Sequence, residues 1–200
     1  GGGIGHLGLS DNGFIGDNMI LINESFAQAN ATSGGGIFIA GQTGLVPDNA
    51  GLLLSPGSGT VTIDSNLIRG NLAGAGDGGG IQLLSVNGED AAGNNCNQCY
   101  SVDIVDNMIN NNVAGLAGGS IAMQDAILVS IQNNTVAHNE STATTALAFA
   151  PGAPNQSNPT PAGIVARAHS TDFALARAEL FEGPVISDSI IEHNRSFFWL

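Results

Sequence analysis

One short pattern recurs five times along the chain, and this repetition restricts the possible folds more than any other feature. Each copy begins with apolar residues that alternate with other residues. A polar pair and then an asparagine follow. One residue later comes Ile or Val, and a second asparagine follows after two more residues. In the last copy the first asparagine is replaced by Ser189. The five copies are residues 14–23, 61–71, 102–112, 129–139 and 185–194.

A glycine-rich block follows most copies after a short stretch of polar or small residues. Each block is a pair or triplet of small residues, mostly glycine, followed by a short apolar stretch. The opening residues 1–4 have the same pattern, and residues 145–149 are interpreted as a degenerate version of it. The three clear blocks are residues 34–39, 78–83 and 118–123.

A double pattern of this kind predicts an all-β solenoid in which each copy forms one coil of three short strands. In the first strand Val61 and Ile63 point inward, because side chains alternate along a strand. Asn66 is expected to make the bend, since asparagine tolerates the left-handed conformation. The glycine run supplies positive φ and room for coil-to-coil approach.

We therefore predict a right-handed parallel β-helix of about five coils, with like residues stacked roughly 4.8 Å apart. The few aromatic residues, 5% of the chain, agree with a core of stacked Ile, Val, Leu and Ala. Two asparagine ladders are expected, formed by Asn18, Asn66, Asn107 and Asn134, and by Asn23, Asn71, Asn112, Asn139 and Asn194.

Insertions lengthen some copies. The spacing between Asn107 and Asn134 gives a bare coil, and we expect the extra length elsewhere to follow the third strand, at about 40–60, 85–101 and 151–184. Insertions at one point of a solenoid emerge on one side and form a loop face. Residues 162–182 are expected to contain a short helix.

We interpret residues 1–200 as a single segment of a longer protein, since the chain opens on glycines without Met.

The two motifs resemble a known family. Ile/Val-x-x-Asn and Gly-Gly-Gly/Ser-Ile are similar to the Phe-x-x-Asn and Gly-Gly-Ala-Ile/Leu/Val repeats of polymorphic outer-membrane-protein passenger domains. This chain departs from them in using Ile or Val for Phe and Gly for Ala. The resemblance implies an exported, surface-displayed and often adhesive rod. The first motif is filled by Ile20–Asn23, Ile68–Asn71, Ile109–Asn112, Val136–Asn139 and Ile191–Asn194.

The charge balance excludes some partners. The chain has no lysine, four arginines and a formal net charge of −13. Binding to nucleic acid requires a basic surface, and an anionic lipid surface repels such a chain. No apolar run approaches the roughly 20 residues that span a bilayer. We expect neither nucleic-acid binding nor direct membrane insertion.

Cys96 and Cys99 form a C-x-x-C pair that has several readings. A redox pair normally opens a helix in a βαβ unit, and a zinc site needs a second ligand pair; neither pattern occurs in the sequence. We predict a small disulfide that closes a loop, which suits an oxidising, extracellular compartment.

Four residues are candidate metal ligands. Asp103 and Asp106 present carboxylates suited to a hard cation such as Ca²⁺, but solvated outward positions on an acidic strand and turn are the preferred explanation. His138 and His193 each precede a ladder asparagine, so coil stacking is expected to bring them together. Two adjacent histidines bind transition metals, although their repeat position alone explains them.

These observations favour an extracellular or cell-surface structural or adhesive scaffold without catalytic activity, whose loops contact a surface polymer, glycan or protein. No catalytic residues are assigned and no cofactor is expected apart from Ca²⁺. One alternative is a pectate-lyase-like polysaccharide lyase, a glycoside hydrolase or a carbohydrate-binding module acting through the loop face. Another is a self-assembling subunit of an extracellular filament. Other segments of the same longer chain are the remaining expected partners.

Overall fold

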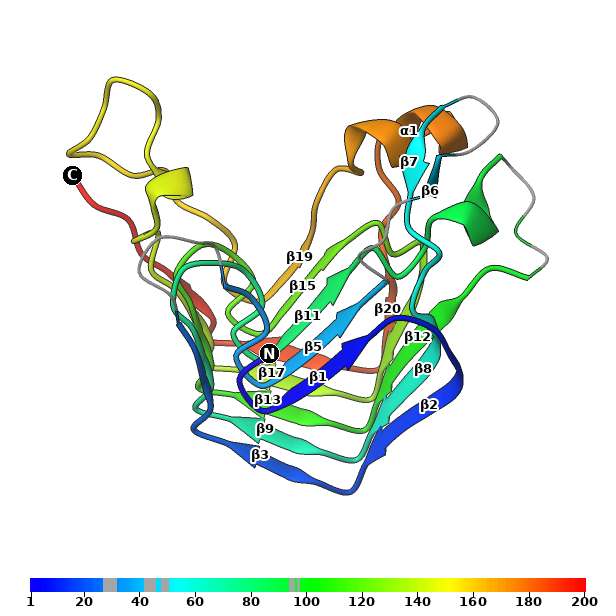
Figure 1. Cartoon of the computed structure of the whole chain (residues 1–200). Helices are drawn as coiled ribbons and strands as arrows, with labels where there is room; N and C mark the ends of the chain where they lie inside the picture. The colour runs from blue at the N-terminus through cyan, green and yellow to red at the C-terminus, as the bar shows by residue number, and fades with distance from the viewer. Residues whose placement is uncertain (27–31, 42–45, 48–50, 94–95, 97) are drawn as a thin grey trace.

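Four parallel sheets of five strands each surround one apolar core in the computed structural model (Figure 1). The structure describes residues 1–200 except 27–31, 42–45, 48–50, 94–95 and 97. The chain passes through the four sheets in a fixed order, named here A, B, C and D, and one such circuit is called a coil. The prediction of an all-β parallel solenoid is confirmed.

The strands of each sheet follow one another at regular places in the sequence. Sheet A contains β1 (Ile4–Leu7), β5 (Ile37–Ala40), β11 (Ile81–Leu84), β15 (Ile121–Gln124) and β19 (Ile164–Ala166). Sheet B contains β2 (Ser10–Gly16), β8 (Gly59–Asp64), β12 (Ser101–Val105), β16 (Leu128–Gln132) and β20 (Val185–Ser187). Sheet C contains β3 (Met19–Leu21), β9 (Leu67–Arg69), β13 (Met108–Asn110), β17 (Thr135–Ala137) and β21 (Ile190–Glu192). Sheet D contains β4 (Glu24–Ser25), β10 (Leu72–Ala73), β14 (Val113–Ala114), β18 (Glu140–Ser141) and β22 (Arg195–Ser196).

The expectation of three strands per coil is wrong, because each coil has a fourth strand. The two residues after the second asparagine pair with their equivalents in the next coil, as Leu72 does with Val113 and Ala73 with Ala114. A two-residue strand has too little alternation to be recognised from sequence, and only pairing with neighbouring coils defines it.

Like residues stack on one another in the core. Ile63 pairs in register with Ile104, and Ile104 with Ile131. All three side chains are fully buried. Their neighbours Thr62 and Asp103 alternate with them along β8 and β12 and are partly exposed, so the predicted direction of the first strand is confirmed.

Both asparagine ladders are present, and they hold the corners of the coils. The Oδ1 of each asparagine accepts the backbone N–H and an Nδ2–H of the asparagine in the preceding coil, at 2.9–3.1 Å. Where asparagine is missing, the Ser189 hydroxyl accepts the N–H of Asn134 instead. The sequence separations of 48, 41, 27 and 55 residues show that the ladders continue despite insertions of different length.

The bend itself lies one residue earlier than expected. The left-handed residue is the one before the ladder asparagine, for example Ser65 with φ 55° and Asp106 with φ 56°. Asn66 instead stabilises the turn, because its Nδ2 group donates to the carbonyl of Asp64. Asparagine is therefore required for its side-chain hydrogen bonds rather than for its backbone conformation.

The glycine blocks have two separate geometric functions. The first glycine has positive φ, as in Gly34, Gly78 and Gly118. The second glycine lies against the backbone of the next coil: a Cβ atom on Gly79 would be 2.5 Å from the carbonyl oxygen of Gly119. Positive φ and close approach were both predicted for this block, and the structure assigns them to successive positions.

The first two predicted insertions follow sheet A as expected. The segment at about 40–60 forms the antiparallel pair β6 (Val46–Pro47) and β7 (Leu53–Leu54). The segment at about 85–101 contains a short 3₁₀ helix, η1 (Glu89–Ala91), and the disulfide between Cys96 and Cys99.

The third predicted insertion, 151–184, needs correction because it contains β19, which pairs with β15 in sheet A. It is two insertions, 142–163 before β19 and 167–184 after it. Residues 145–149 are not the glycine block of this coil, because they contain the 3₁₀ helix η2 (Ala146–Ala148). The expected short helix is confirmed as α1 (Thr171–Arg177). No helix among the described residues is long and apolar enough to cross a membrane.

Candidate functional site

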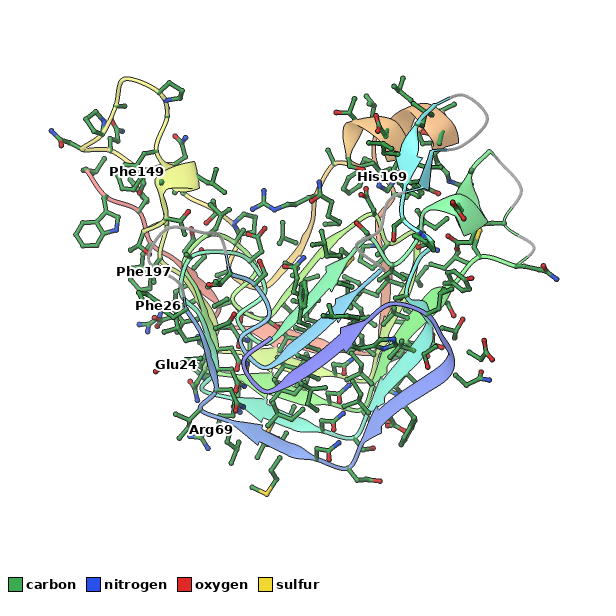
Figure 2. All side chains as sticks on the ribbon, in the orientation of Figure 1. Glu24, Phe26, Arg69, Phe149, His169 and Phe197 are labelled. Carbon is green, nitrogen blue, oxygen red and sulfur yellow. A yellow bond between two sulfur atoms is a disulfide. The ribbon has the colours of Figure 1, made fainter. Side chains whose placement is uncertain are left out.

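Insertions rise on both sides of sheet A and flank its outer face (Figure 1). Along one edge stand the three insertions between sheets A and B, which carry β7, η1 and α1. Along the opposite edge stands segment 142–163, which joins sheet D to β19. Figure 2 shows this arrangement through Phe149 in one wall and His169 in the other.

A pocket of about 530 Å³ lies between these walls over the last strands of sheet A. Its principal polar feature is an ion pair in which Nε and Nη2 of Arg167 donate to the two carboxylate oxygens of Asp77, both at 2.7 Å. Asp77 precedes β11 and Arg167 follows β19, so the pair crosses the outer face of the sheet. The lining residues are Asp77, Leu116, Gln124, Leu147, Ala148, Asn158, Thr160 and Arg167.

A second pocket of about 390 Å³ opens beside the first, and Gln124 lines both. It lies between β7, the ends of β11 and β15, and the start of α1. One oxygen of Asp172 accepts the N–H of Leu53 at 3.0 Å and thereby connects α1 to β7. The two pockets together are called the trough.

The larger pocket offers mainly neutral hydrogen-bonding groups, whereas Asp125 and Asp172 add carboxylates to the lining of the smaller one. Asp77 neutralises Arg167, and the remaining polar groups of the larger pocket are the amides of Gln124 and Asn158 and the hydroxyl of Thr160. A salt-bridged guanidinium retains N–H donors but attracts anions weakly. With a chain charge of −13, the site suits a ligand rich in hydroxyl groups better than a polyanion.

A buried histidine anchors the wall that carries α1. The side chain of His169 is only 1% exposed, and its Nδ1 and Nε2 atoms lie 3.3 Å from Asp125 and 3.5 Å from Glu182. Neither ring nitrogen has a partner with hydrogen-bond geometry, so the two carboxylates contact the ring at ion-pair distance only. The ring also packs edge-on against Phe173 in α1. Asp125 accepts the N–H of Ser170 at 2.8 Å, which fixes the insertion to the turn after β15.

Acidification is expected to loosen this wall. Two hydrogen bonds from Arg177 lower the pKa of Glu182 below its usual value of 4.5. A carboxyl group whose pKa is lowered by folding stabilises the fold above its unfolded pKa, and this contribution disappears as the pH falls through the folded value. Hydrogen exchange of the α1 amides, corrected for intrinsic rates, should therefore accelerate below about pH 4.5. In an Arg177→Gln variant the amides should already exchange faster at pH 7 and show a weaker acid dependence; equal pH profiles would contradict this role for the pair.

The four candidate metal ligands lie outside the trough. Asp103 lies on the outer face of sheet B between Thr62 and Ser130, and Asp106 occupies the left-handed turn position that follows β12. Within the described ranges, no three His, Cys, Asp or Glu side chains gather in a way that could hold an ion.

His138 and His193 are brought together as expected. Their rings stack with centroids 5.1 Å apart and planes 5° from parallel. The lone pairs of imidazole nitrogens lie in the ring plane, so two parallel stacked rings direct them along parallel lines rather than toward one shared ion. Stacking follows from their equivalent positions before Asn139 and Asn194.

Sequence reasoning missed the residues that form the trough and its wall. Arg167 and Asp77 are 90 residues apart, and neither belongs to the repeated pattern. His169 lies in an insertion outside the repeat and carries no sequence signal of its own. Asp125, at a corner of the coil, gave no signal, because its partner lies in an insertion without a repeat.

Comparison with protein-family models, curated proteins and solved structures finds no match to this chain. The function must therefore be inferred from the geometry of the site.

Proposed function

We propose that this protein is an extracellular or cell-surface β-helix scaffold that adheres to a neutral, hydroxyl-rich polymer through the trough over sheet A. The observation that carries this proposal is the pair of neighbouring pockets between the two walls, which share the lining residue Gln124. An extended polymer fits a groove that continues across several parallel strands. Amide and hydroxyl groups match the donors and acceptors of a sugar chain.

The electrostatics support a neutral rather than an acidic ligand. The one arginine in the larger pocket is neutralised by Asp77, and the chain as a whole is strongly acidic. A pectate-lyase-like activity would require the chain to hold an acidic polysaccharide, which this surface disfavours. Adhesion without chemistry is therefore the preferred function.

The remaining parts of the proposal rest on general physical arguments. Crossover connections between parallel strands are right-handed in nearly all proteins, so we assign a right-handed helix of about five coils. The Cys96–Cys99 disulfide supports an oxidising compartment outside the cell. A surface-displayed passenger, as the repeat motifs imply, and membership of a longer chain are both consistent with this placement.

Polysaccharide binding tests the proposal. Affinity electrophoresis in gels containing xylan, mixed-linkage glucan, mannan or polygalacturonate should show retardation by at least one neutral polymer. Replacing Gln124 by Trp fills the junction of the two pockets and should weaken that binding at least tenfold, roughly 1.4 kcal/mol. Thr62→Trp, on the outer face of sheet B, is the matched control and should bind as the unmodified protein does.

Three results would count against this function. The first is no retardation in any neutral polymer, and the second is equal retardation of the Gln124→Trp variant and the control. The third is an increase in unsaturated-uronide absorbance with polygalacturonate and Ca²⁺, which would identify the enzyme alternative instead.

A further inference from the structure

A third pocket, of about 620 Å³, lies against the outer face of sheet D and is called the side groove. It shares no lining residue with the trough. Its apolar floor contains Leu72 and Val113, the outward residues of two neighbouring strands of that sheet. Figure 2 shows Phe26 and Phe197, which also line the groove, on this side of the solenoid.

Aromatic residues gather in the side groove although the chain has few of them. The whole sequence contains eight phenylalanines and one tryptophan, and three of these phenylalanines and the tryptophan line the groove. They are Phe26, Phe197, Phe198 and Trp199, which are 67%, 44%, 47% and 58% exposed. Exposed aromatic side chains that cluster in a concave surface are typical of a binding site rather than of a core.

The repeat of the coil spaces these rings along the groove. The residue that follows each strand of sheet D stacks on its equivalent in the next coil through backbone hydrogen bonds of 2.8–3.0 Å. In successive coils this position is occupied by Phe26, Gly74, Gly115, Thr142 and Phe197. Four coil spacings of about 4.8 Å separate the first ring from the last by roughly 19 Å. The two glycines between them keep the floor low.

The aromatic residues at the second end of the groove are held by segment 142–163 and by sheet D. The N–H of Phe197 donates to the carbonyl oxygen of Ser141 at 2.8 Å. The N–H of Trp199 donates to Oγ of Ser157 at 2.9 Å, and its carbonyl oxygen accepts the N–H of Ser157 at 3.0 Å. A backbone fixed in this way presents the rings without a large loss of entropy on binding.

The charged groups of the side groove are paired with one another. Glu140 forms an ion pair with Arg195, whose guanidinium also lies over the ring of Phe197, 5.4 Å from its centroid. The hydroxyls of Thr142 and Thr144, which lie 3.0 Å apart, also line the groove. The groove therefore combines aromatic faces and hydroxyl groups with compensated charge, which is complementary to an uncharged ligand.

We propose that the side groove is a second binding site, for a neutral sugar chain whose rings stack on Phe26, Phe197 and Trp199. The C–H groups on the face of a sugar ring are attracted to the negative face of an aromatic ring. The hydroxyl groups at the edge of the sugar match the threonine hydroxyls. A peptide strand fits less well, because Leu72 already pairs with Glu24 and Val113 on its two sides, and the outer face of the sheet offers no free strand edge.

The side groove opens sideways, at right angles to the direction in which the coils stack. The inference therefore does not depend on where the stack of coils begins or ends. It also holds whether or not the trough binds a polymer, because the two surfaces share no lining residue.

The single tryptophan of the chain reports on this groove directly. Adding cellohexaose, xylohexaose or mannohexaose should change the emission of Trp199 saturably and protect it from quenching by acrylamide. Phe26→Ala removes a ring from the opposite end of the groove and should weaken the binding about fivefold. Phe14→Ala is the matched control, because Phe14 in β2 is 64% exposed and lies outside the groove.

Circular dichroism shows that both variants are folded before they are compared. The proposal is overturned if none of the three oligosaccharides changes the emission of Trp199, or if the two variants bind equally well. A response to octanol without a response to any sugar would assign the groove to an apolar ligand and overturn it too. Retardation in polysaccharide gels without a response of Trp199 would leave the trough as the sugar site and reject the side groove.

Discussion

Replacing Asn112 by alanine is expected to lower the free energy of unfolding by about 3–5 kcal/mol. The Oδ1 of this fully buried residue accepts both the N–H and the Nδ2–H of Asn71, each at 2.9 Å. Its Nδ2 group donates to Ile68 and to Asn139, each at 3.0 Å. Alanine leaves these partners unpaired in the core, where each unsatisfied buried group costs roughly 1–3 kcal/mol.

Asn23→Ala is the matched control, because it removes the same side chain from the open end of the same ladder. Asn23 is partly exposed. Its substitution removes only the hydrogen bond from Nδ2 of Asn23 to Oδ1 of Asn71, because the backbone N–H of residue 23 still donates to the same oxygen. The expected loss is about 1 kcal/mol. Urea unfolding followed by circular dichroism measures both variants; equal losses would show that the ladder does not stabilise the solenoid through its buried bonds.

The second large effect is expected from Gly79→Ala, at about 3 kcal/mol or more of lost stability. A Cβ atom at this position would lie 2.5 Å from the carbonyl oxygens of Gly119 and Val113 and 2.6 Å from the carbonyl carbon of Val113. These are backbone atoms of the next coil, so no side-chain rotation relieves the contact. The coils must separate locally, which disturbs the strand pairing on both sides.

Gly5→Ala provides the comparison within the same sheet. Nothing lies within 4 Å of a Cβ atom at Gly5, on the outer face of β1, and stability should change by less than about 0.5 kcal/mol. Thermal unfolding of the two variants, together with the unmodified chain, measures the difference. If Gly79→Ala were as stable as Gly5→Ala, the glycine block would be required only for its positive φ at Gly78.

The repeat predicted the solenoid because its information is local and redundant. The spacing of Asn66 and Asn71 recurs in almost every copy, and a stack of identical coils is the arrangement that buries every copy of the pattern equally. The disulfide between Cys96 and Cys99 follows from other sequence evidence: the two residues are three apart, and neither a zinc nor a redox pattern accompanies them. Within each coil, however, the prediction placed the left-handed backbone conformation on the ladder asparagine. The structure places it on the residue before that asparagine.

Errors arose where the repeat weakens. The last coil has only Gly163 before β19 in place of a full glycine block, so residues 145–149 seemed the better match. β19 is recognisable in the structure because Ile164 pairs in register with Ile121. A strand of three residues is recognised by the strand it pairs with. Here the paired residues, Ile121 and Ile164, are 43 residues apart in the sequence.

The sequence by itself determined the parallel solenoid, its asparagine ladders and the positions of most insertions, because these depend on residues repeated at short spacing. Only the tertiary structure decided that insertions rise on both sides of sheet A and that Arg167 reaches Asp77 between them. It also decided that His169 lies between Asp125 and Glu182. These contacts join segments that share no repeat, and their geometry is set by the stacking of the coils beneath them rather than by any local preference of the chain.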